Sequence, residues 1–216
     1  MKALFTLLTL ILVAAVIIYF LPGTIHIEKT MALKAQPEVV YEELNTTGEW
    51  KKWAAWLKED PVIEITYHGP ESSAGAALNW NSQVAEINTG NVLLESSQKD
   101  SQVKALIQFD KYGKSENSFV SGNTGNGTQV NWTLEINVAE KGFPTGWINK
   151  IKAFSWKKTL AEWMDTSLKN LDEVTANTEY HPKPTINDTL IERLDSLNRK
   201  VDSLKSLQKQ KDTVYP

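Results

Sequence analysis

Apolar and polar positions form three successive patterns along the chain, and the first is an uninterrupted apolar run at residues 3–21 (ALFTLLTLILVAAVIIYFL). This run carries no charge, and thirteen of its nineteen residues are Leu, Ile, Val or Phe. A helix of that length extends about 28 Å, close to the ~30 Å hydrocarbon core of a bilayer. The run therefore predicts a membrane anchor, which we assign to residues 1–23.

Two other interpretations of the apolar run remain, a cleaved signal peptide and a buried core helix. A signal peptide ends in small residues at an A-x-A-like site, whereas residues 19–24 read YFLPGT. The flanking charges nearly balance, with Lys2 on one side and Lys29 and Lys34 on the other. They therefore give only a weak indication of how the helix is oriented in the membrane. The short N-terminal tail favours a soluble domain on the extracytoplasmic side, which is the periplasm in a bacterium.

The second pattern consists of short segments with strand character, from residue 24 to about residue 139. Residues 24–34 alternate and predict a first strand. Pro37 and Glu38 favour the start of a helix, and a second short helical stretch covers residues 50–57. Six more predicted strands follow between turn-forming residues, at 62–67, 76–83, 91–97, 103–109, 117–121 and 129–138. Consecutive strands of this kind predict an antiparallel meander.

The third pattern is a helical stripe over residues 147–174. Its apolar side chains recur at three- and four-residue spacing: Trp156, Leu160, Trp163, Met164, Leu168, Leu171 and Val174. The concave face of the sheet is the nearest surface that can cover this stripe. The sequence therefore predicts an α+β fold of the helix-grip type, in which a curved antiparallel sheet of about seven strands wraps a long C-terminal helix, with an N-terminal transmembrane helix added.

A linker and a heptad-patterned helix follow the predicted domain of residues 24–175. Residues 176–185 (ANTEYHPKPT) are polar and contain prolines, which is typical of a linker. Within the C-terminal segment, residues 186–216, the stretch 186–211 carries a heptad seam: Asn187, Leu190, Leu194, Leu197, Val201 and Leu204. Three interpretations of this seam stay open: a coiled coil that joins copies of the chain, docking on its own domain, or a solvated tail.

The amino-acid composition excludes several kinds of functional site. The chain has no cysteine and three histidines far apart in sequence, so we expect no disulfide, no thiolate chemistry and no metal site. A net charge of −3 argues against nucleic acid as a partner. No phosphate-binding glycine motif or nucleophile motif is present, and we expect no cofactor. Eight tryptophans are many for 216 residues and predict an aromatic core or cavity.

Five segments in order resemble the START-related SRPBCC superfamily, especially its polyketide cyclase/dehydrase-like branch. They are ALKAQPEVVYEEL (32–44), WKKWAAW (50–56), ITYHGPESSAGAALNW (65–80), GNGTQVNWTLE (125–135) and TSLKNLDEV (166–174). The resemblance covers residues 24–175 and rests on the order of the segments, because no single one is specific. It implies a deep cavity between sheet and helix that accepts apolar or amphipathic small molecules.

The residues expected to form this cavity are mostly aromatic. Trp80 and Trp132 lie in predicted strands, and Trp53 and Trp56 belong to a run with three-residue spacing that suits either a cavity rim or plain packing. We assign to the cavity the side chains of Trp53, Trp56, Tyr67, Trp80, Trp132, Phe154 and Trp163. Tyr67 and His68 point to opposite faces of a strand, so the pair is a poor acid–base couple, and we predict no catalytic residue.

Three functions follow from these observations and stay open at the level of sequence. The first is a membrane-tethered protein that binds a lipophilic small molecule without catalysis. The second is an enzyme of the cyclase or dehydrase type, which requires polar side chains that converge inside the cavity. The third is a structural or regulatory module that acts through its C-terminal helix. An apolar wall favours the first, ionisable groups in the wall favour the second, and a filled interior favours the third.

Overall fold

The computed structural model describes residues 2–178, 190 and 193–205, and the chain divides into two units near residue 179. The first unit begins with α1 (Lys2–Phe20), which has no buried residue. This helix is long and apolar enough to cross a membrane. A signal sequence has the same length and composition. The helix α1 alone therefore does not distinguish a membrane span from a signal sequence.

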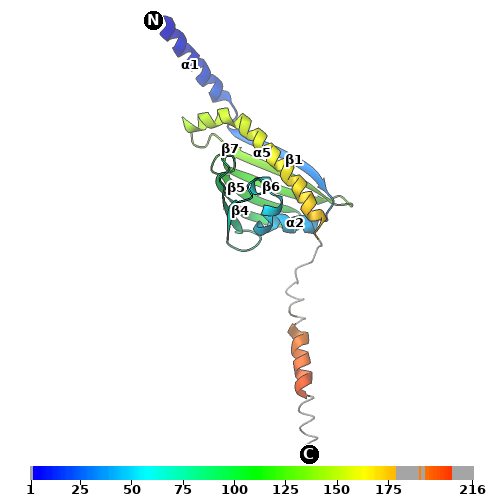
Figure 1. Ribbon diagram of the computed structural model, residues 1–216. Coiled ribbons are helices and arrows are strands. Elements are labelled where there is room, and N and C mark those ends of the chain that lie inside the picture. The colour runs from blue at the N-terminus through cyan, green and yellow to red at the C-terminus, as the bar shows by residue number, and fades with distance from the viewer. Residues whose placement is uncertain (1, 179–189, 191–192, 206–216) are drawn as a thin grey trace, which may run out of the picture. The chain divides into compact units, whose positions relative to one another are not determined.

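Seven antiparallel strands form one curved sheet (Figure 1). Their bounds are β1 (Thr24–Leu33), β2 (Glu64–His68), β3 (Ala77–Asn81), β4 (Thr89–Gln98), β5 (Gln102–Phe109), β6 (Gly113–Asn123) and β7 (Thr128–Asn137). The order across the sheet is β1-β7-β6-β5-β4-β3-β2, so the meander continues from β2 to β7 and returns to the first strand. The alternation of the sequence places one row of side chains on the inner face, such as Val103, Ala105, Ile107 and Phe109 of β5.

Short helices form a corner between β1 and β2. They are α2 (Pro37–Asn45), the single turn η1 (Thr47–Glu49), α3 (Trp50–Trp53) and α4 (Ala55–Lys58). The predicted helical stretch of residues 50–57 is therefore interrupted, because Ala54 has an extended conformation with φ −66° and ψ 114°. This break turns the chain so that Trp53 and Trp56, on successive helices, both become buried.

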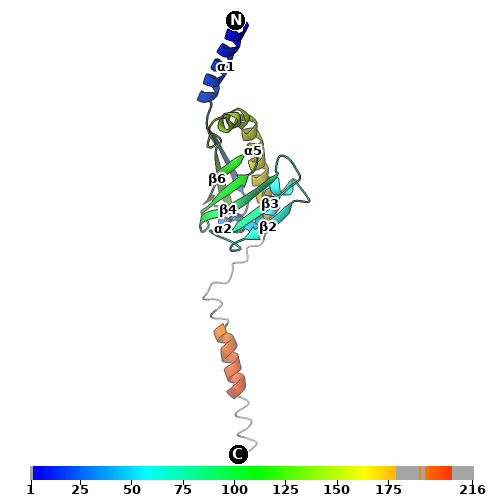
Figure 2. The ribbon, with the colours of Figure 1, turned by 90° about the vertical axis from the view of Figure 1, so that its left-hand side faces the viewer.

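The long helix α5 (Thr145–Ala176) lies along one face of the sheet (Figures 1 and 2). Its buried side chains include Trp156, Leu160, Trp163, Met164, Leu168 and Leu171, which are the positions of the predicted stripe except Val174, which is only partly buried. Two contacts pin it to the corner: the Ala55 amide donates to Ser167 Oγ at 2.8 Å, and Asn170 Nδ2 donates to the Trp53 carbonyl at 3.0 Å. The predicted α+β helix-grip fold is confirmed.

Strand β1 and helix α5 run side by side in the same direction. Near the start of β1, a Cβ on Gly23 would lie 3.8 Å from Lys150 Cε. Farther along, Lys29 Nζ lies 2.6 Å from Asp165 Oδ2, and the Lys34 amide donates to Asp172 Oδ1 at 2.9 Å. The chain therefore enters the domain beside the N-terminal half of α5 and leaves it, after Ala176, at the opposite end.

The second unit contains a helix over residues 193–205, and its seam side chains are exposed. Leu190, Leu194, Leu197, Val201 and Leu204 are 45–64% exposed. The linker beyond residue 178, Asn187 and residues 206–211 lie outside the described residues. All three interpretations of the seam stay open: a coiled coil that joins copies of the chain, docking on its own domain, and a solvated tail.

Candidate functional site

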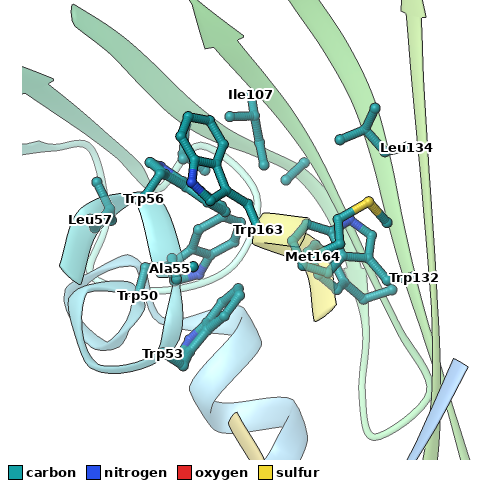
Figure 3. Packing of buried hydrophobic residues seen from close by; sticks show 14 of the residues in the cluster. Trp50, Trp53, Ala55, Trp56, Leu57, Ile107, Trp132, Leu134, Trp163 and Met164 are labelled. Carbon is teal, nitrogen blue, oxygen red and sulfur yellow. The ribbon is translucent and has the colours of Figure 1, made fainter. Parts of the chain in front are cut away.

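Six tryptophans from four parts of the chain meet between the sheet and α5, and we call them the tryptophan cluster. Figure 3 labels five of them, all except Trp80. Its members are Trp50, Trp53, Trp56, Trp80, Trp132 and Trp163, all at most 8% exposed. Trp56 lies at the centre, with its ring centroid 5.6 Å from Phe109, 6.4 Å from Trp80 and Trp132, and 6.5 Å from Trp163. Edge-on and tilted arrangements dominate, which are the geometries that aromatic rings prefer.

Hydrogen bonds fix the orientation of four of these indoles. Trp50 Nε1 donates to the Leu44 carbonyl at 2.9 Å, and Trp53 Nε1 donates to the Glu43 carbonyl at 3.3 Å. Trp132 Nε1 donates to Asn117 Oδ1 at 3.0 Å, and Trp163 Nε1 donates to Glu59 Oε2 at 2.9 Å. The indole N–H groups of Trp56 and Trp80 are buried and have no acceptor. A buried donor without a partner costs about 1–3 kcal/mol, so these two groups remain able to bind an acceptor.

The space enclosed by the cluster is small. Its wall consists of Trp56, Ile107, Phe109, Trp132, Leu134, Leu160, Trp163 and Met164. The void has a volume of about 10 Å³, which is roughly what one water molecule requires. None of the eight lining residues is ionisable. The interior at this point is a filled aromatic core rather than the deep cavity expected from the family resemblance.

The structure brings together five of the seven residues assigned to the cavity from sequence. Trp53, Trp56, Trp80, Trp132 and Trp163 all belong to the tryptophan cluster. The aliphatic part of the wall, such as Leu134 and Met164, was not predicted from the sequence. The sequence pattern did indicate that both are buried, because Leu134 lies on the same face of its strand as Trp132 and Met164 belongs to the helical stripe.

The other two assigned residues lie outside the cluster. Tyr67 is 51% exposed on β2, the edge strand of the sheet. Phe154 is 88% exposed because it precedes Trp156 by two residues, which places it on the opposite side of the helix. The three- and four-residue spacing of the stripe already excludes Phe154 from the buried side.

Ionisable groups near the cluster are few and do not converge. Burial raises the pKa of the Glu43 carboxyl, which is 5% exposed, while the charge of Lys52 opposes that shift. Burial and a 2.8 Å hydrogen bond from its hydroxyl to Glu86 raise the pKa of Tyr112 well above its usual range. In the described part of the chain, no three His, Asp or Glu side chains lie close enough together to hold a metal ion.

A polar groove crosses the outer face of the sheet, away from the cluster. It is lined by His26, Glu95, Lys104, Glu116, Asn117, Ser118, Thr133 and Glu135, and has a volume of about 260 Å³. His26 Nδ1 and Glu135 Oε1 are 2.9 Å apart, with both side chains more than half exposed. Both side chains of this pair therefore lie in solvent rather than in an enclosed pocket. We therefore interpret the groove as an ordinary polar sheet face.

Comparison with known proteins supports the fold and identifies no family. No family model matches the chain, and no curated protein is similar to it in sequence. A Staphylococcus aureus protein of unknown function is similar in structure, with 17% identity and a TM-score of 0.54, over 72% of this chain and 97% of that one. An uncharacterized Rhizobium leguminosarum protein has 10% identity and a TM-score of 0.51, over 72% and 96%.

A third similar structure is StfQ, a di-domain aromatase/cyclase from the steffimycin biosynthetic pathway. It has 10% identity and a TM-score of 0.51, over 69% of this chain and 50% of that one. Likeness at this level of identity shows a common fold only. It is consistent with the polyketide cyclase-like fold that the sequence resembles, and it assigns no chemistry.

Proposed function

We propose that this protein is a membrane-anchored module without catalysis, whose closed helix-grip domain separates the bilayer from a C-terminal helix that pairs with a second copy. The observation that carries the proposal is the filled interior. With about 10 Å³ of free space, the void inside the tryptophan cluster is too small for a substrate or lipid unless large rings move. A wall without ionisable groups also offers no acid or base for a cyclase reaction.

The chain enters and leaves the domain at opposite ends, as expected for a domain that acts as a spacer. The chain enters at Gly23, three residues after α1, and leaves at the far end of α5. Helix α5 has 32 residues, which corresponds to a length of roughly 48 Å. The C-terminal tail follows that end of α5 in the chain and carries a seam of exposed leucines, the surface that would pair with another copy.

Analytical ultracentrifugation of the full chain in a mild detergent tests the pairing. Leu197→Glu with Val201→Glu places two charges in the seam, so we expect a loss of the oligomer. Ser196→Glu with Ser203→Glu adds the same charge at positions outside the seam, and we expect it to sediment like the wild type. A wild-type monomer, or equal sedimentation of both variants, would contradict the proposal.

Binding of a small lipophilic molecule is the second candidate function. The indole N–H of Trp56 favours it, because this donor is buried in an apolar wall and has no acceptor. A ligand with one carbonyl or hydroxyl oxygen satisfies that donor if the surrounding rings open. Native mass spectrometry of the full chain distinguishes the candidates: a stoichiometric co-purified lipid supports binding, and its absence together with an oligomer supports the module.

A further inference from the structure

The N-terminal half of α5 carries apolar side chains that face away from the sheet. Phe143 in the preceding turn is 77% exposed, and Ile148, Ile151 and Phe154 are 49%, 55% and 88% exposed. We call these four residues the outer apolar face. Such a concentration of large exposed side chains on one helix surface marks an interaction site.

Lysines flank the outer apolar face. With about 100° per residue, Ile148 and Phe154 lie on either side of Ile151, whereas the buried Trp156 and Leu160 lie roughly opposite. Lys150 and Lys152 flank Ile151 on its two sides, and Lys141, Lys157 and Lys158 lie close in sequence. Glu140 is the only acidic residue between positions 140 and 158. An apolar strip bordered by lysines is the pattern of a helix that lies in a membrane interface.

The outer apolar face lies close to where the apolar α1 ends. Helix α1 ends at Phe20, and Gly23 is already held in the domain, since the amides of Val138 and Ala139 donate to its carbonyl at 2.9 and 3.3 Å. Lys150 Nζ also donates to the Tyr19 carbonyl at 3.0 Å. Two residues between helix and domain span less than about 11 Å. A bilayer crossed by α1 therefore begins next to this half of α5.

We propose that the outer apolar face inserts into the interfacial layer of the bilayer that α1 crosses, with its lysines on anionic headgroups. This inference rests on the membrane anchor of the proposed function. Helix α5 then has a partner on each of two opposite sides. The sheet covers the side of Trp156 and Leu160, and lipid covers the side of Ile151 and Phe154. The domain is then held against the membrane rather than hanging from a free linker.

The absence of cysteine allows a direct test with the full chain. Ser155→Cys, beside the outer apolar face, and Asn126→Cys, in the hairpin at the opposite end of β1, each provide one site for a nitrobenzoxadiazole label. The labelled proteins are reconstituted into phosphatidylcholine vesicles with and without phosphatidylglycerol. We expect the label at 155 to brighten several-fold and shift to the blue, more strongly with phosphatidylglycerol, and to be quenched by doxyl-labelled lipid. The fluorescence of the label at position 126 should stay the same as that of the label in water.

A second variant separates insertion from anchoring. Ile151→Asp with Phe154→Asp should abolish the change at position 155, while the protein still floats with the vesicles. If the chain with Ser155→Cys as its only change floats while its 155 label stays water-like, the inference is overturned and the anchor remains intact. A blue shift without quenching by doxyl lipid would also overturn it, because a protein surface then covers the face. Failure of the chain to float would overturn both the anchor and this inference.

Discussion

Individual side chains close the interior of this domain, and Trp56 contributes most. Its ring contacts Trp50, Trp80, Phe109, Trp132 and Trp163. Aromatic pairs in such geometries contribute about 0.5–1.5 kcal/mol each beyond their burial. A ligand that enters must break several of these contacts, so the closed state is favoured in the absence of a ligand.

Gly90 permits this closure because the Trp80 ring occupies the position where a side chain would begin. A Cβ at residue 90 would overlap the Trp80 ring and the carbonyl oxygen of Gln108. Gly90→Ala should therefore lower the free energy of unfolding by about 1–3 kcal/mol, the usual cost of overpacking. Gly122→Ala is the matched control, since no atom lies within 4 Å of its Cβ position. Urea unfolding measures both, and equal midpoints would contradict this packing.

Glu43 predicts a pH dependence of stability. Its pKa is raised above the ordinary value of 4.5 because burial disfavours the charged carboxylate. The Glu43 carboxyl binds its proton more tightly in the folded state than in the unfolded chain. Its protonation therefore contributes fully to the free energy of unfolding below pH 4.5, and this contribution is lost as the pH rises through the folded pKa. Glu43→Gln should flatten that fall and raise the thermal midpoint at neutral pH. Glu140→Gln, at an exposed position, should leave the profile unchanged, and identical profiles for all three proteins would refute the assignment.

At the scale of elements, the corner helices and α5 hold each other through few polar contacts. Ser167 is fully buried, and its hydroxyl accepts the amide of Ala55 at the first residue of α4. Ser167→Ala leaves that amide without a partner, so the free energy of unfolding should fall by about 1–3 kcal/mol. The control is Ser155→Ala on the exposed side of α5, which should change it little. Guanidinium unfolding curves that coincide would show that the contact contributes nothing.

Element positions were predictable from sequence, whereas the filling of the interior was not. Alternation placed the strands within a few residues, although β2 starts at Glu64 rather than at residue 62, because Val62 is 76% exposed in the preceding turn. The periodic stripe likewise identified the buried side of α5. Whether Trp56 and Trp132 line a cavity or fill it depends on side-chain volumes across the sheet, and periodicity carries no information on volume.

At the scale of the molecule, the apolar helix α1 leads to a prediction about membrane association. With 19 residues, mean hydropathy of 2.7 and no buried residue, this helix predicts that the full chain stays with membranes during an alkaline carbonate wash. Leu10→Arg with Val13→Arg adds about 5–7 kcal/mol to insertion, so that variant should be released. Leu10→Ile with Val13→Ile keeps the apolar character and should remain bound. A wild-type protein that is released, or whose mature N-terminus begins after residue 20, would remove the anchor.

The parallel course of β1 and α5 has a mechanical consequence. If the domain is fixed at Gly23 and pulled from the end of α5, tension acts along the axis of β1. The ten residue pairs that join β1 to β7, from Thr24–Asn137 to Leu33–Thr128, then bear the load together in shear instead of opening one after another. The ion pair between Lys29 and Asp165 resists the same sliding motion. Under such a pull the domain would resist unravelling from one end, because its terminal strand is loaded along its whole length.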